Sequence, residues 1–108
     1  MHTEIVKHCE GGIGEVKMEH LLEPMEMHGK IRLYARVTIE PGNSLGYHEH
    51  HHESESYFIL SGTGVYSDNG MKRTVKSGEI TYTPNGFGHG MENVGSEPLV
   101  FMALVVLD

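Results

Sequence analysis

The chain has little of several residue types on which whole classes of protein depend. Its 108 residues include one cysteine, Cys9, so no disulfide can form within the chain. Lysine and arginine together number 8 against 15 acidic residues, which gives a formal net charge of -7. A phosphate backbone requires a basic patch, and an anionic membrane surface attracts basic segments. We therefore expect neither nucleic acid nor membrane as a partner.

Long apolar runs are also absent from the sequence. No segment reaches the length of a transmembrane helix, and the N-terminus lacks the apolar core of a secretory signal. We therefore expect a cytoplasmic protein. A chain of this length has room for one hydrophobic core, in which about two thirds of the unfolded surface leaves water. One domain is predicted.

Glycine, by contrast, is abundant, and the apolar residues follow the period of β-strands. The 14 glycines suit a fold with many tight turns. Strict alternation of apolar and polar residues predicts a half-buried strand over 31–39. Asp68-Asn69-Gly70 predicts a hairpin between strands at 65–67 and 71–75. These short strands indicate an all-β sandwich or barrel, with further strands at 55–61, 79–83 and 99–107.

Two segments place metal-ligand side chains on a frame of glycines and a proline. Residues 42–62 read G-x5-H-x-H-x4-E-x6-G, and residues 78–93 read G-x5-P-x-G-x2-H-x3-N. Three imidazoles and one carboxylate suit a divalent transition metal, namely zinc, manganese, iron, nickel or copper. Ligand type does not choose among these metals.

The geometry of strands explains why these side chains can meet at one point. Residues two apart in a strand point to the same side, so His48 and His50 form a pair on one face. Glu55 begins the next strand, and His89 comes from a later one. Burying such groups without a partner is costly, and a bound cation removes that cost. We predict one metal ion per chain.

The first segment allows a second choice of histidine pair as metal ligands. His50 and His52 also share a face, and histidine tracts such as 50–52 bind metal adventitiously or stay solvated. The gap of five residues after Gly42 favours His48 and His50. His51 and His52 are then expected in a connecting loop.

At these motifs the chain resembles the cupin superfamily, in particular its small single-domain members. The two motifs and their spacer cover residues 42–93, about half of the chain. The resemblance implies a small antiparallel β-barrel of jelly-roll type with the metal near one mouth. It also implies the metal ligands, which are His48, His50, Glu55 and His89. The four-residue gap before the glutamate is similar to that of oxalate-metabolising members and germins, and other branches share it.

Further cavity residues are predicted by parity along the strands. Tyr57 shares the face of Glu55, so it is the candidate catalytic residue, as a proton donor or substrate anchor. To act as a base near neutral pH its phenol would need a lowered pKa. Met91 is expected as a wall residue. The remaining candidates for the cavity wall are Ile80, Tyr82, Tyr47, Tyr34 and Arg36; for each tyrosine the alternative is a wall residue with a hydrogen-bonded hydroxyl.

The last strand bears on the oligomeric state. Residues 99–107 are apolar at every position, so we expect this strand to be covered on both faces. A small barrel covers only its inner face, and a second subunit would complete the cover, so a homodimer is predicted. The resemblance points the same way. Residues 1–30 are expected to form an N-terminal segment with an edge strand at the dimer contact, or else a loose tail, and residues 31–108 the barrel domain.

Two functions are compatible with this site. Three histidines and one glutamate leave one or two positions of an octahedral ion open for water or substrate. The first function is a metal-dependent enzyme acting on a small chelating molecule, such as a carboxylic or keto acid, a diketone or a sugar derivative. Dioxygenase, decarboxylase, lyase and isomerase reactions all fit, because fold and ligands do not decide the reaction. The alternative is a binding or sensing module without turnover, and no cofactor besides the metal is indicated.

Overall fold

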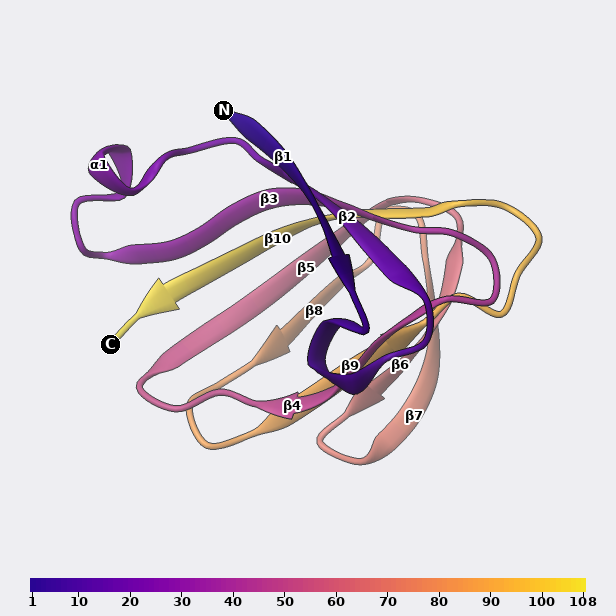
Figure 1. The fold of residues 1–108 in the computed structure, drawn as a ribbon. Coiled ribbons are helices and arrows are strands. Elements are labelled where there is room, and N and C mark those ends of the chain that lie inside the picture. The colour runs from indigo at the N-terminus through magenta and orange to yellow at the C-terminus, as the bar shows by residue number, and fades with distance from the viewer.

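Ten strands form two antiparallel sheets that face each other in a computed structural model describing all of residues 1–108 (Figure 1). The six-stranded sheet has the order β1 (His2–Lys7), β2 (Glu15–His20), β3 (Ile31–Ile39), β10 (Leu99–Leu107), β5 (Glu53–Ser61) and β8 (Ile80–Thr83). The four-stranded sheet has the order β4 (Ser44–Glu49), β9 (Gly88–Glu92), β6 (Thr63–Asp68) and β7 (Met71–Lys76). The predicted antiparallel jelly-roll fold is confirmed, as two facing sheets rather than a fully closed ring of strands.

Helical structure is limited to two short turns. The 3-10 turn η1 (Cys9–Gly11) joins β1 to β2, and the single-turn helix α1 (Pro24–Met27) precedes β3. Neither has the length and apolar character that crossing a membrane requires.

The core lies between the sheets because each strand turns its alternate apolar residues inward. On β3 the inward residues Val37 and Ile39 are fully buried, and β10 contributes Phe101 opposite Val37 and Leu99 opposite Ile39. The four-stranded sheet supplies Tyr66 and Met91 to the same cluster. The strands predicted at 31–39 and 99–107 have these bounds in the structure. The predicted hairpin is also present, with Asn69 and Gly70 at positive φ of 50° and 95° in its turn.

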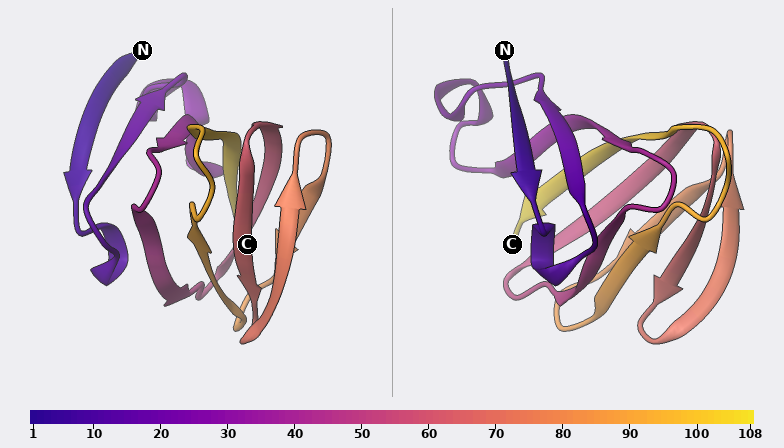
Figure 2. Two further views of the ribbon diagram at one scale, coloured as in Figure 1. Left: turned by 90° about the vertical axis from the view of Figure 1, so that its right-hand side faces the viewer. Right: turned by 45° about the vertical axis from the view of Figure 1, so that its right-hand side comes forward.

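The first thirty residues extend the six-stranded sheet within the same chain. β1 pairs with β2, and β2 pairs with β3, so these residues are not a loose tail. Figure 2 shows this N-terminal hairpin, in indigo and purple, on one side of the molecule and β7 on the other. The turn η1 and Gly12, which follows it, pack closely against β4. A Cβ at Gly12 would collide with the carbonyl oxygen of Ser44. The hairpin therefore closes one side of the space between the sheets.

Candidate metal centre

Both sheets contribute to a cluster of four metal-ligand side chains. His48 on β4 and His89 on β9 are cross-strand partners, and Glu55 comes from β5 of the facing sheet. His50 follows the end of β4, where its backbone is hydrogen-bonded to Gly86 and Phe87. One ligand atom from each of the four side chains lies within 4.8 Å of the others. The structure thus brings together the residues of both sequence motifs.

The inner atoms of the cluster have more close neighbours than hydrogen bonds from their protons can account for. Nε2 of His89 lies 3.0 Å from Nε2 of His50, 3.1 Å from Nε2 of His48 and 3.0 Å from Oε1 of Glu55. Nε2 of His50 lies 2.9 Å from the same carboxylate oxygen. An imidazole nitrogen carries at most one proton, so it cannot donate to three neighbours at once. A single cation among these atoms would bind them all, and the donor set suits a divalent transition metal.

The outer nitrogens of the histidines orient the inner ones. Nδ1 of His48 donates to the carbonyl oxygen of Gly46 at 2.8 Å, and Nδ1 of His50 donates to the carboxylate of Glu53 at 2.5 Å. Both partners accept these hydrogen bonds, so in the neutral imidazole Nδ1 carries the proton and the lone pair of Nε2 faces the cluster.

The third histidine is held by hydroxyl groups. Nδ1 of His89 lies 2.8 Å from the hydroxyl of Tyr66 and 3.0 Å from Oγ1 of Thr83. Those two hydroxyls are themselves 2.7 Å apart. Each of the three imidazoles therefore has a fixed ring orientation and a different outer partner.

The charges in the cluster favour a cation. Burial raises the pKa of Glu55, but hydrogen bonds from His48, His50 and His89 outweigh it and hold that pKa well below its usual range. Burial lowers the pKa of His89. The hydrogen bond to Glu55 raises the pKa of His50, against the effect of burial, and the Arg32 guanidinium lowers the pKa of Glu53. An anionic carboxylate and a neutral His89 are the forms that bind metal.

Tyr57 lies beside the cluster. Its ring stacks on that of His89 with centroids 4.9 Å apart, and its hydroxyl is 3.4 Å from Nε2 of His89. Burial raises the pKa of Tyr57 well above 10, so the phenol stays neutral and donates hydrogen bonds. A base would need the opposite change, a lowered pKa.

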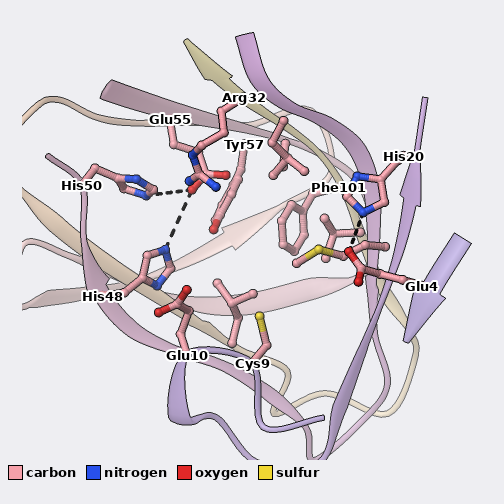
Figure 3. Close-up of a pocket in the computed structure, with 15 residues that line it drawn as sticks. Glu4, Cys9, Glu10, His20, Arg32, His48, His50, Glu55, Tyr57 and Phe101 are labelled. Atoms are coloured by element: carbon pink, nitrogen blue, oxygen red, sulfur yellow. Dashed lines mark hydrogen bonds and ion pairs between the residues drawn. The ribbon is translucent and has the colours of Figure 1, made fainter. Parts of the chain in front are cut away.

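A cavity of about 230 Å³ opens onto the cluster (Figure 3). His48, His50, Glu55 and Tyr57 form one wall, and His89 lies behind them, fully buried. Further polar side chains in the lining are Glu4, Glu10, His20 and Arg32, and the apolar part consists of Met18, Leu33, Val37, Leu45, Phe101 and Ala103 together with Cys9. The cavity thus joins a polar, metal-ligating wall to an apolar one.

Several predicted wall residues lie elsewhere. Ile80 and Tyr82 are 64% and 59% exposed on the outer face of the six-stranded sheet, whereas Thr81 and Thr83 point inward. The reason is the pairing of β8 with β5, which sets Thr83 opposite Glu55. The prediction for Ile80 and Tyr82 was wrong.

The less specific candidates are wrong as well. Tyr47 and Tyr34 are 50% and 36% exposed and do not line the cavity. Arg36 forms an exposed ion pair with Glu19.

His51 and His52 lie exposed in the connection between β4 and β5, outside the cluster. Met91 is buried in the core, in keeping with a wall role.

Other residues around the cluster have no signal in the motifs. Arg32 belongs to the polar phase of the alternation in β3, which predicts an outward side chain. A β-bulge changes this, because Val105 of β10 pairs with Leu33 and Val106 pairs with Ile31, and Arg32 has no partner. Tyr66 could have been found as a large residue in the alternation of β6. The five cavity residues of the N-terminal segment follow only from its docking.

Comparison with known proteins agrees with this geometry. The sequence model of the Cupin domain matches residues 35–106. The oxalate-binding protein of Thermotoga maritima is 44% identical over 104 residues, which are 96% of this chain and 86% of that protein. The crystal structure of a predicted oxalate decarboxylase from Thermotoga maritima has a TM-score of 0.96 at 42% identity, covering 100% of this chain and 94% of that one.

A longer enzyme shares part of the chain. The oxalate decarboxylase of Bacillus subtilis is 37% identical over 75 residues, which are 65% of this chain but only 20% of the enzyme. The match to the Cupin domain spans well over half of the chain, and the two sheets and the histidine–glutamate cluster are where that family's motifs predict them. The chain belongs to the cupin family.

Proposed function

We propose that the protein binds one divalent transition metal through His48, His50, Glu55 and His89 and, at that metal, a small dicarboxylate of the size of oxalate. The observation that carries the proposal is the convergence of four ligand atoms within 4.8 Å, with lone pairs turned inward by outer hydrogen bonds. When bound, the metal would act as a Lewis acid that polarises an oxygen of the ligand.

The cavity supports a small anionic ligand. Its volume of about 230 Å³ lies below the range of about 300–1,000 Å³ typical of pockets for drug-sized molecules. Arg32 is the one lysine or arginine in the lining. Its Nε and NH2 groups already bond Glu53, so its remaining N–H groups and its positive charge are what it offers to a carboxylate. Glu4 and Glu10 also line the cavity, so an anion would depend on the charge of the metal for its attraction. The names of the similar proteins favour oxalate as the first ligand to test.

Binding is tested with the intact protein and single metals. Metal-free protein loaded with manganese, zinc, iron, nickel or copper is expected to hold one ion per chain. Calorimetric titration with oxalate is expected to show binding to loaded protein and none to metal-free protein. His50→Ala should abolish tight metal binding, and the matched control His51→Ala, in the exposed loop, should not. Stoichiometric metal in the His50 variant would contradict the ligand set.

A second candidate is a metal-dependent enzyme acting on the same class of acid, and the position of Tyr57 favours it. Its neutral hydroxyl, 3.4 Å from Nε2 of His89, can donate a hydrogen bond or a proton to a bound ligand. Phe101 and the neighbouring apolar wall keep water away from one side of the cavity. Carbon dioxide release and oxygen uptake, measured on loaded protein with a panel of small acids, distinguish an enzyme from a binding module. Absence of both with every metal would leave the binding function alone.

We also propose a homodimer that forms through the outer face of the six-stranded sheet. On this face Phe58 of β5 pairs with Ile80 of β8 and Met102 of β10. Phe58 and Ile80 are 45% and 64% exposed in the single chain. A contiguous apolar face of this kind is typical of an interface between proteins. A second copy would cover the outer side of β10, as its apolar sequence predicts.

A further inference from the structure

One histidine of the cluster is held by a charged pair. Glu53 is 8% exposed and accepts a hydrogen bond from Nδ1 of His50 at 2.5 Å. Arg32 donates to both oxygens of the same carboxylate, from Nε at 2.7 Å and from NH2 at 2.8 Å. The guanidinium, the carboxylate and the imidazole thus form a chain that ends at the cluster.

The other two histidines have no such support. His48 donates to a backbone carbonyl, and His89 contacts two hydroxyls. A carboxylate accepts a hydrogen bond about twice as strongly as a neutral group and increases the electron density on the opposite nitrogen of the ring. His50 therefore differs from its neighbours in how firmly it is oriented and how strongly it donates.

The fold places the arginine at this pair through a local irregularity. Arg32 is the unpaired residue of the bulge between β3 and β10. Its side chain is 55% exposed and lies at the rim of the cavity, where its guanidinium meets Glu53. Its two bonds fix both oxygens of Glu53. A free Glu53 could rotate, and its carboxylate would compete with Glu55 for a cation or lose contact with His50.

We propose that Arg32 and Glu53 form a positioning pair that fixes the tautomer and ring orientation of His50 and strengthens its bond to the metal. Neither residue binds the metal itself. This inference rests on the proposed metal site and adds a cause for its affinity outside the four ligands.

The test compares two arginine–glutamate pairs that share β3. Arg36 and Glu19 form an equivalent fork on the exposed surface, so Glu19→Gln is the matched control for Glu53→Gln. Affinity for Co²⁺ is measured by chelator competition, without any organic ligand, together with the visible spectrum of the bound ion. Glu53→Gln is expected to weaken binding by about 10–100-fold and to alter the spectrum. Glu19→Gln should change neither.

A second variant keeps the test decisive if Glu53→Gln fails to fold. Arg32→Lys retains the charge but loses the paired geometry, so a smaller loss of affinity and a spectral change are expected, against none in Arg36→Lys. A purely structural role would lower the unfolding temperature of metal-free protein and leave the spectrum unchanged. Wild-type affinity and spectrum in both Arg32→Lys and Glu53→Gln would overturn the inference. If instead the unaltered protein binds no Co²⁺, the proposed metal site is wrong, and the inference with it.

Discussion

The protonation of His50 sets the pH range in which the proposed site can hold a metal. The hydrogen bond to Glu55 raises the pKa of His50 above its ordinary value of 6.5 in the metal-free chain. A protonated imidazole does not bind metal. Metal affinity should therefore begin to fall, as the pH is lowered, at a pH above 6.5. His89, whose pKa burial lowers, stays neutral to lower pH and does not set this limit.

The raised pKa of His50 affects the stability of the metal-free fold in the opposite direction to metal affinity. A raised pKa stabilises the folded chain below the unfolded value, and this contribution disappears as the pH rises through the folded value. Chelator competition between about pH 5 and 8, with thermal unfolding of metal-free protein alongside, measures both trends. A metal affinity that stays constant over this range would contradict the assignment of His50 as a ligand.

Tyr57 is the side chain that separates a catalyst from a binder. Tyr57→Phe keeps the ring that stacks on His89 and removes the hydroxyl, so metal content and unfolding temperature should hardly change. In an enzyme, turnover should fall by about 10²-fold or more. In a binding module, ligand affinity should fall by about 0.5–1.5 kcal/mol, the value of one neutral hydrogen bond. If turnover and affinity both stay unaltered, Tyr57 is a wall residue.

The contact of η1 with β4 can be tested at the scale of elements. Gly12 has an ordinary φ of -73°, so Gly12→Ala adds no backbone strain, but its Cβ would collide with the carbonyl of Ser44. We expect a loss of about 1–3 kcal/mol in the free energy of unfolding, as for other overpacked sites. The four residues proposed to bind the metal lie outside this contact, so metal stoichiometry should be retained. The affinity for oxalate should fall, because Cys9 and Glu10 of η1 line the cavity. Denaturant unfolding and calorimetry check the two effects.

Gly95→Ala is the control for that variant. A Cβ at Gly95 would meet Oδ1 of Asn93 at 3.4 Å and the carbonyl oxygen of Thr63 at 3.8 Å, both ordinary contacts, so stability should change little. Equal losses in the two variants would show that η1 does not depend on close packing against β4.

The elements also show how far the sequence predicts this molecule. Period-two alternation located β3, a continuous apolar run located β10, and motif spacing located the cluster, because all three depend on short-range geometry. The prediction of which β8 residues point inward was wrong, because the pairing of β8 with β5 decides it. Thr81 and Thr83 are polar, so by composition alone they resemble outward-facing residues. The bulge that aims Arg32 at Glu53 depends on the register of two strands far apart in sequence. No local pattern contains that information.

The assembly of the whole molecule can be tested by placing a charge on the outer face of β10. Met102 lies between Arg36 and Phe58 on this face and is half-buried in the single chain. If two copies pack there, Met102→Lys should convert a dimer into monomers, because an unpaired charge would be buried in the interface. Sedimentation velocity of both proteins at equal concentration measures this.

A loop position provides the comparison. Val94→Lys places the same charge on a residue that is 67% exposed outside the strands, and it should leave a dimer intact. Sedimentation of the unaltered protein as a monomer would refute the homodimer.

The cavity takes its cluster residues and a third of its lining from separate parts of the chain, and this division has a consequence for divergence. The four cluster residues all lie between positions 48 and 89, whereas five of the 15 residues that line the cavity lie within the first twenty positions. Substitutions in the early segment would change which molecules enter and how they are held, without touching the four residues proposed to bind the ion. Selectivity can then change through substitutions in the N-terminal hairpin while the four residues of the proposed metal site stay the same.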